Sequence, residues 1–286
     1  MISSASNEKI KHVAKLVKSA SGRRSEGVFV VEGERICAEI PKERFVEGYV
    51  SESFVKKMEC SGKVSFGTGH DHNPGGDSED NVYPISSDGQ VTFKGLPFVI
   101  VSDQVYKKMS DTVSGQGILA VVRQLKKDPV DFVDDFEDGD IKLLILENIQ
   151  DPGNLGTMIR TAEAAGFDGI ITDRNTVDVY NPKVIRSTMG GIFRMPVMAA
   201  DDLIELIDDL RIREIKLYGA ILDGSVDYRE ADYGKRLAIL IGNEGNGLSK
   251  EARALVDTRV RIPMQGQVES LNAAVAAAIL MYEANK

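Results

Sequence analysis

The sequence has no tryptophan, three histidines and only two cysteines, Cys37 and Cys60. Two cysteines are too few for a disulfide framework or a four-thiolate metal site, and they suit a reducing cytoplasm. Apolar runs long enough to cross a bilayer are also missing, and the first residues lack the hydrophobic core of a signal peptide. These absences predict a cytoplasmic globular protein with no membrane partner and no metal site.

What is present is an ordinary globular composition with an uneven distribution of charge. The chain has 286 residues, enough for two domains, and a net charge of −9. Its first 24 residues carry +5, so the remainder carries −14. Lys9, Lys11, Arg23 and Arg24 belong to this basic start, and the two arginines are expected on a loop that ends the first helix. A local basic face predicts RNA contact, and a solvated helix face is the ordinary alternative.

Residues 1–123 predict a small mixed α/β domain. Short apolar strands are expected at 28–31, 46–50, 63–66, 97–101 and 117–122. Helices are expected around residues 9–18, at 33–40 and at 104–109. Between them, the polar stretch from Gly69 to Asp80 resembles an inserted surface loop. Its His70 and His72 lack a third ligand of matching geometry, so a metal site there is disfavoured.

An acidic segment separates the two halves. Residues 128–140 contain seven acids and no base. Like charges at this density repel one another and favour a solvated, extended chain. We therefore expect a linker over residues 124–140.

From residue 141 onward, strands and helices alternate. Strands are expected at 141–146, 169–172, 216–220, 238–241 and 258–262, and helices at 155–165, 181–189, 201–211, 249–256 and 270–284. This alternation predicts a parallel sheet covered on both faces. In such sheets, ligands bind beyond the carboxyl ends of the strands.

Three of these strand ends continue into unusual loops. The first contains a turn signal, Asp151 to Asn154, with Arg160 about a turn and a half further along the following helix. The second runs from Gly242 to Gly247, and its glycines are expected to leave backbone amides bare around the carboxylate of Glu244. The third ends at Ser270 and Asn272, where Ser270 is expected to cap the last helix. Side chains from the three loops can face one site.

The Gly242 loop has the glycine spacing of a phosphate-binding loop but not its chemistry. Leu248 stands where the required lysine would be, and Glu244 would repel phosphate. A carboxylate in such a loop suits a ligand with positive charge and hydroxyls, and S-adenosylmethionine fits that description. A dinucleotide cofactor is disfavoured, because no strand is followed by the G-x-G-x-x-G pattern.

The three loops together resemble the motifs of the SpoU family of RNA 2′-O-ribose methyltransferases, in the SPOUT superfamily. The matching residues, in the family's order, are Asn154-x-Gly156-x-x-x-Arg160-Thr161-Ala162, Ile241-Gly242-Asn243-Glu244-Gly245-x-Gly247-Leu248 and Ile262-Pro263-Met264-x-Gly266-x-x-x-Ser270-Leu271-Asn272. The first half resembles the L30-like substrate-binding domain often fused to this family. That likeness lies in Ser6-Asn7-x-x-Ile10-Lys11, residues 29–35 and residues 116–120.

The resemblance implies properties that spacing alone does not. It implies a methyltransferase domain over residues 141–286 whose parallel sheet carries a C-terminal trefoil knot, a homodimer formed through that domain, and S-adenosylmethionine as cofactor. The residues it assigns to catalysis are Asn154, Arg160, Glu244, Ser270 and Asn272, and those it assigns to the cofactor are Ala220, Gly242, Gly245, Ile262, Met264 and Leu271. Arg160 is a poor base, because its guanidinium stays protonated, so electrostatic support of the reaction is expected.

Several functions remain open at this level. The one favoured is 2′-O-methylation of ribosomal RNA, and methylation of transfer RNA is the nearest alternative. A non-catalytic RNA-binding protein on the same fold would not need the five polar residues assigned to catalysis. A nucleotide-dependent enzyme would use the Gly242 loop and would be stabilised by ATP rather than by S-adenosylmethionine.

Overall fold

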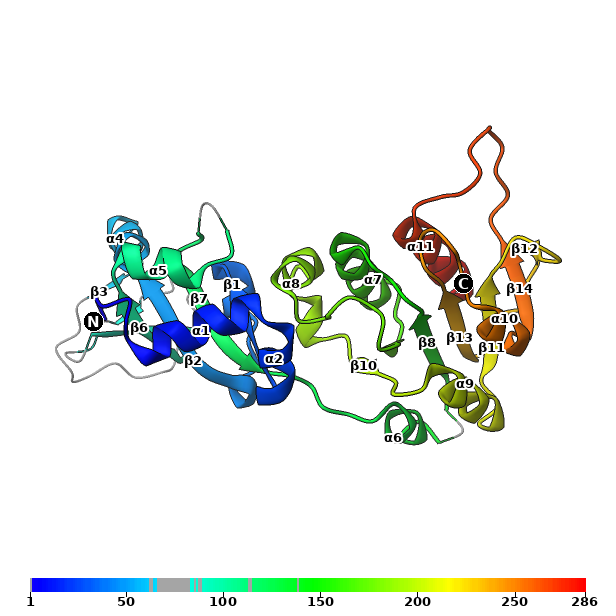
Figure 1. Ribbon diagram of the computed structural model, residues 1–286, viewed down its shortest axis with the longest axis horizontal. Helices are drawn as coiled ribbons and strands as arrows, with labels where there is room; N and C mark the ends of the chain where they lie inside the picture. The colour runs from blue at the N-terminus through cyan, green and yellow to red at the C-terminus, as the bar shows by residue number, and fades with distance from the viewer. Residues whose placement is uncertain are drawn as a thin grey trace. The chain divides into compact units, whose positions relative to one another are not determined.

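The computed structural model describes residues 2–61, 64–65, 83–84, 86, 89–112, 115–137 and 139–286. The chain divides into two compact units, Met1–Gln124 and Leu125–Lys286 (Figure 1). The stretch from Gly69 to Asp80, with its two histidines, lies outside the described residues. Within them, no helix is both long and apolar enough to cross a membrane.

The first unit is built on a mixed five-stranded sheet. Four of its strands were predicted; the strand at Gln90–Phe93 was not, and the strand expected at 63–66 does not belong to this sheet. Its strands, in spatial order, are β1 (Val28–Glu32), β7 (Ile118–Arg123), β2 (Phe45–Ser51), β6 (Leu96–Val101) and β5 (Gln90–Phe93). Only β2 and β6 run parallel; the other neighbours are antiparallel. A short parallel pair, β3 (Val64–Ser65) and β4 (Tyr83–Pro84), stands apart from this sheet.

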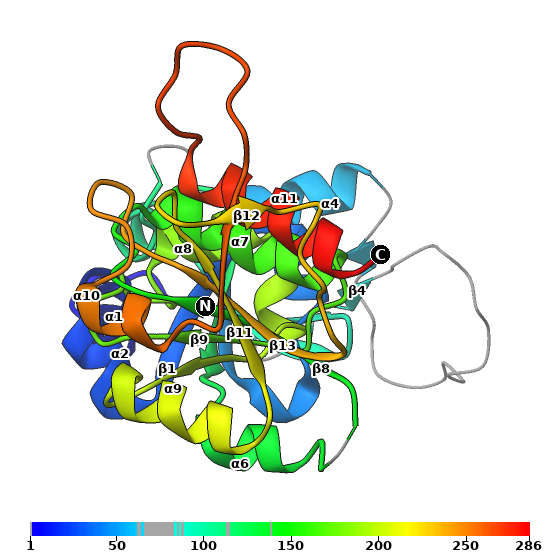
Figure 2. The same ribbon diagram turned by 90° about the vertical axis from the view of Figure 1, so that its right-hand side faces the viewer.

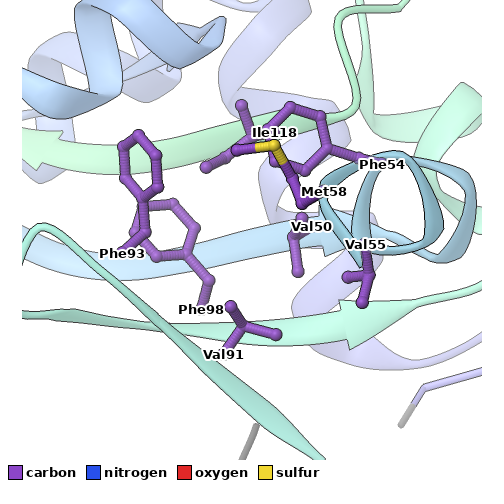
Figure 3. A pocket seen from close by; sticks show the side chains of 8 residues that line it. All are labelled: Val50, Phe54, Val55, Met58, Val91, Phe93, Phe98 and Ile118. Carbon is purple, nitrogen blue, oxygen red and sulfur yellow. The ribbon is translucent and has the colours of Figure 1, made fainter. Parts of the chain in front are cut away.

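Helices cover both faces of the first sheet. The apolar side of α1 (Glu8–Lys18), namely Ile10, Val13, Leu16 and Val17, packs with α5 (Asp103–Met109) on one face. On the other face, Phe54 and Met58 of α4 (Glu52–Cys60) meet Phe98 and Ile118 (Figure 3). The apolar cavity between them has a volume of about 10 Å³. Its lining offers no polar partner to a water molecule, so the cavity is a small packing defect of the core.

The segment after α1 differs from its prediction. Instead of a loop, residues 20–26 form a second helix, α2 (Ala20–Glu26), capped by Ser19 and ended by Gly27 in the left-handed conformation. Arg23 is only 3% exposed, and its Nη1 donates to the carbonyls of Leu16 (2.6 Å) and Val17 (3.0 Å). The Arg23 guanidinium therefore satisfies the end of α1 rather than reaching outward, while Arg24 is exposed. Two short helices follow in this unit, α3 (Glu34–Ala38) and η1 (Lys42–Arg44).

The acidic segment also differs from its prediction as a solvated linker. Asp128 caps a helix, α6 (Pro129–Asp134), by accepting from the amides of Val130 and Asp131. Phe132 and Val133 of this helix are buried in the core of the second unit. The acids that the structure describes in this segment are exposed, so the charge density obscured a helix with an apolar side.

The second unit contains the predicted parallel sheet, with seven strands. In spatial order they are β10 (Val197–Ala199), β9 (Gly169–Thr172), β8 (Ile141–Leu146), β13 (Arg236–Ile241), β11 (Lys216–Ala220), β14 (Thr258–Arg261) and β12 (Val226–Asp227). Every neighbouring pair is parallel. The five expected strands are confirmed, and the short strands β10 and β12 at the two edges were not predicted.

Two layers of helices enclose this sheet (Figure 2). One core joins α6, α9 (Leu203–Ile212) and α10 (Lys250–Leu255) to the side chains of Ile141, Leu143 and Ile145. Against the other face lie α7 (Pro152–Ala164), α8 (Pro182–Thr188), the turn η2 (Gly191–Phe193) and α11 (Ala273–Ala284). The trefoil knot implied by the family resemblance stays a prediction.

Candidate functional site

The carboxyl ends of three neighbouring strands form the floor of the site. Leu240 of β13 lies opposite Gly219 of β11, and Ala220 lies opposite Val260 of β14. Gly242 and Ile262, which follow β13 and β14, therefore flank Ala220 at one edge of the sheet. Parallel strands align their carboxyl ends in this way, so segments far apart in sequence share one edge.

The first loop starts helix α7 earlier than predicted. Asp151 is its N-cap and accepts from the amide of Asn154 (2.8 Å), and Pro152 occupies the first helical position. An Asp-Pro pair is a helix-start signal as well as a turn signal, because proline lacks the amide that such a position leaves unpaired. The side chain of Asn154 consequently projects from the first turn of the helix.

The carboxylate of Glu244 is bound by this first turn. Its Oε2 accepts from the amide of Gln150 (3.2 Å), and its Oε1 accepts from the amide of Asp151 (3.2 Å) and from Nδ2 of Asn154 (3.0 Å). Partial burial opposes ionisation of Glu244, but these hydrogen bonds outweigh it and lower the pKa of the carboxyl below its ordinary value. Glu244 was expected to face a ligand, but its carboxylate instead joins two loops.

Asn154 carries the connection on to the third loop. Its Oδ1 accepts from Nδ2 of Asn272 (2.9 Å), and Oδ1 of Asn272 accepts from the amides of Ala274 (2.9 Å) and Val275 (3.3 Å). Asn272 is therefore the N-cap of α11. The prediction that Ser270 caps this helix is wrong. A continuous hydrogen-bond chain, Glu244–Asn154–Asn272, joins the three motif loops.

The Gly242 loop is tight, and its amides are not bare as expected. Oδ1 of Asn243 accepts from the amides of Gly245 (3.0 Å) and Asn246 (3.1 Å), while its Nδ2 donates to the carbonyl of Asn148 (2.9 Å). The amide of Gly247 donates to the carbonyl of Asn243 (2.9 Å). Asn243 thus stabilises its own loop from within and ties it to the loop after β8.

Gly242 is required by this close fold. A Cβ added to it would lie 2.1 Å from the carbonyl carbon of Gly247 and 2.2 Å from the amide nitrogen of Leu248. Both are backbone atoms, which cannot rotate away as a side chain can. Only glycine lets the loop fold back over the end of β13.

Arg160 lies on the exposed side of α7. Pairing with Glu163 or Glu244 was the alternative to a functional role. The carboxylate of Glu163 instead faces Arg194, and that of Glu244 faces Asn154. Within the part of the chain that the structure describes, the Arg160 guanidinium has neither a hydrogen bond nor an ion pair.

The remaining predicted residues lie in the following places. Ser270 is exposed in the loop between β14 and α11, which projects from the unit (Figure 2), and among the described residues its hydroxyl has no hydrogen-bond partner. Ile262, Met264 and Leu271 on the same loop are half-buried, and Gly245 is exposed. In the first unit, Lys9 and Lys11 are exposed on α1, and Lys11 pairs with Glu8 at 2.7 Å.

Two sets of residues near the site were not predicted. One is Asn243 with its hydrogen-bond partners, and the other is the Glu163–Arg194 ion pair. Asn243 stands inside a glycine-rich loop, where asparagine commonly binds its own backbone, and that was an available signal. No local signal linked Glu163 to Arg194, 31 residues away. Among the described residues, no three His, Cys, Asp or Glu side chains group to hold a metal ion.

The profile of the SpoU rRNA methylase family matches residues 142–282. A Bacillus subtilis (strain 168) protein named 23S rRNA (guanosine(2553)-2′-O)-methyltransferase RlmP is 32% identical over 281 residues, covering 98% of this chain and 97% of the relative. That match extends over both units of the chain.

Two crystal structures from Sinorhizobium meliloti are similar over 99% of this chain and 96% of theirs. One, an rRNA methyltransferase, is 26% identical with a TM-score of 0.75. The other, an rRNA methyltransferase with S-adenosylmethionine bound, is 25% identical with a TM-score of 0.73. These likenesses confirm the predicted α/β fold class.

Proposed function

The chain belongs to the SpoU rRNA methylase family, and from that membership we propose that it transfers a methyl group from S-adenosylmethionine to a ribose 2′-hydroxyl of ribosomal RNA. One observation carries the proposal from the family to this chain. The hydrogen-bond chain Glu244–Asn154–Asn272 brings all three family motifs to one edge of the sheet. Three of the five polar residues that the resemblance assigns to catalysis therefore lie in contact at one place.

The edge of the sheet suits the cofactor. Ala220, Gly242 and Ile262 present backbone side by side, and at Gly242 any side chain would collide with the facing loop. We assign the cofactor to this backbone, with Gly245, Met264 and Leu271 beside it. S-adenosylmethionine, when bound, supplies the electrophilic methyl group. The protein's part is to align the ribose oxygen and to lower the cost of removing its proton.

Arg160 is assigned to the reacting oxygen. Its guanidinium is always charged, so it stabilises a developing alkoxide or holds a neighbouring phosphate and does not act as base. Its exposure and its lack of a protein partner within the described residues support this role. Asn154 and Glu244 shape the site, and Ser270 with Asn272 is assigned to the ribose.

The RNA is assigned to the first unit together with the site. Lys9 and Lys11 on α1 and Arg24 on α2 are exposed, and they support a phosphate-binding face. Arg23 is removed from this face by its burial. Ribosomal RNA is favoured over transfer RNA because the relative that matches both units is named for 23S rRNA. A cytoplasmic homodimer joined through the second unit completes the proposal.

A nucleotide-dependent enzyme is disfavoured by the same geometry. A phosphate-binding loop offers free backbone amides, whereas those of Gly245, Asn246 and Gly247 are already used within the loop. Glu244 adds a negative charge at this position. ATP is therefore expected not to raise the melting temperature, and S-adenosylmethionine is expected to raise it.

The test is methylation of defined RNA. Purified protein is incubated with methyl-tritiated S-adenosylmethionine and with ribosomal or transfer RNA from cells that lack the gene. We expect label in ribosomal RNA, at an alkali-resistant dinucleotide that marks a 2′-O-methyl group. Arg160→Ala should lower turnover by at least about 100-fold, the cost of losing one preorganised charge donor. Its affinity for the cofactor, measured by calorimetry, should not change. Turnover retained by this variant would refute the assigned role.

A further inference from the structure

The carboxylate of Glu163, which follows Arg160 along α7, already forms an ion pair with another residue. Glu163 lies three residues after Arg160 on α7, a spacing that makes side chains neighbours on a helix surface. Its carboxylate faces the guanidinium of Arg194 instead. Nε of Arg194 contacts Oε1, and Nη2 lies 3.2 Å from Oε2. Two parallel bonds of this kind are the most specific pairing between arginine and a carboxylate.

The turn that brings Arg194 to this position passes very close to α7. A Cβ added at Gly191 would lie 3.2 Å from Oε2 of Glu163 and 3.7 Å from Cα of Arg160. The turn therefore approaches the helix at the point where these two residues adjoin. Met189 and Gly190, both with positive φ (52° and 91°), redirect the chain from α8 into this turn. The Glu163 carboxylate is thus held beside Arg160 without being paired to it.

We propose that Arg194 is a positioning residue: by holding Glu163, it keeps the guanidinium of Arg160 available to the RNA. The inference rests on the proposed function of Arg160. Without Arg194, the carboxylate at the i+3 position is released, and it competes with the RNA for the only cation beside it on α7. Its negative charge also repels an approaching phosphate or alkoxide.

The test is a double-mutant cycle in the methylation of deproteinised ribosomal RNA. Arg194→Ala should lower kcat about fivefold, the size expected when an exposed arginine gains a neighbouring carboxylate partner. Its affinity for S-adenosylmethionine should not change. Adding Glu163→Gln to this variant removes the competing charge and should restore kcat to within about twofold of the wild type. Glu163→Gln alone should stay within about twofold as well.

A matched control lies on the other side of the sheet. Arg213 makes a similar two-bond pair with Asp134 (2.6 Å and 3.1 Å), remote from α7. Arg213→Ala should leave kcat unchanged while costing about as much thermal stability as Arg194→Ala. If Glu163→Gln fails to rescue Arg194→Ala, or if Arg213→Ala loses the same activity, the positioning role is overturned. If the wild type does not methylate RNA, the proposed function fails first and this inference fails with it.

Discussion

The orientation of the Asn154 amide is dictated by its partners. The Glu244 carboxylate can only accept hydrogen bonds, so Asn154 must turn its NH₂ group toward it. Its oxygen then faces Asn272, which must donate, and the oxygen of Asn272 is left for the first amides of α11. One order of donors and acceptors satisfies the whole chain, and each side chain is fixed by the next.

Removing the charge of Glu244 should therefore weaken the junction of all three loops. In Glu244→Gln, the new NH₂ group faces amide donors and at least one of the three bonds is lost. We expect the melting temperature at neutral pH to fall by about 2 °C, since the site is exposed.

The pH dependence of the melting temperature is the control for the Glu244→Gln prediction. The pKa of Glu244 is lowered by folding from its ordinary value of 4.5. Its stabilisation is therefore fully present above pH 4.5 and is lost as the pH falls through the folded-state pKa. The difference in melting temperature between wild type and Glu244→Gln should shrink below pH 4.5. A difference that stays constant down to pH 3 would contradict this account.

The meeting of Asn154, Glu244 and Asn272 could be predicted from the sequence, because parallel strands align the loops at their carboxyl ends. The internal role of Asn243 was not predicted. In the sequence, an asparagine that binds its own loop looks the same as one that faces a ligand. The burial of Arg23 was missed for a similar reason. A paired arginine after a helix suggests a surface, and only the packed structure shows that its donors satisfy the carbonyls at the end of α1.

At the scale of whole elements, strands were easier to predict than helix ends. β8, β9 and β11 have the predicted bounds, and in β8 and β9 a run of buried isoleucine and leucine residues marks the strand clearly. Helix starts depend on which of several polar residues turns back to cap. Asp151 and Asn272 perform this role, whereas the prediction started α7 at residue 155 and α11 at residue 270.

The cap of α11 gives a direct test with a matched control. Asn272→Ala removes the acceptor for two amides and should cost about 1 kcal/mol, or about 3 °C in melting temperature. Ser270→Ala, two residues away in the exposed loop, should leave the melting temperature unchanged. Scanning calorimetry of the two variants separates the possibilities. If Ser270→Ala proves the more destabilising, the helix begins at Ser270 in solution.

At the scale of the whole molecule, the order of the strands explains where the site lies. The chain goes outward from β8 to β9 and β10, crosses to β11, and then returns through β13 to the position beside β8. Strand connections therefore diverge next to β8 and β13, and the loops after both strands meet at the carboxyl edge of the sheet, where ligands bind in folds of this kind. The spatial order of the strands could not be predicted. The hydrophobic pattern indicates which segments are strands, but not which strands are neighbours in the sheet.

The composition of α11 indicates a covered outer side. Apart from Glu283 near its end, the helix is apolar around its circumference, the pattern of an enclosed helix. Ala274, Ala277 and Leu280 are buried within the unit, yet Val275 is 47% exposed and Tyr282 is 55% exposed. Residues seven apart lie on one side of a helix, so these two mark one apolar stripe. A second copy of the chain, as in the proposed homodimer, would cover it.

Charges placed on this stripe should therefore separate the protomers. In a chain carrying both Val275→Glu and Tyr282→Glu, each interface would bury four uncompensated carboxylates, and the dimer dissociation constant should rise by at least about 100-fold. Sedimentation velocity over a range of concentrations measures it, with far-ultraviolet circular dichroism to verify folding. Ile212→Glu is the matched control, because Ile212 is 78% exposed on α9, on the opposite face of the sheet, and should leave the mass unchanged. If the double variant still sediments as a dimer, α11 is not the interface; if the wild type is a monomer at all concentrations, its apolar outer side needs another explanation.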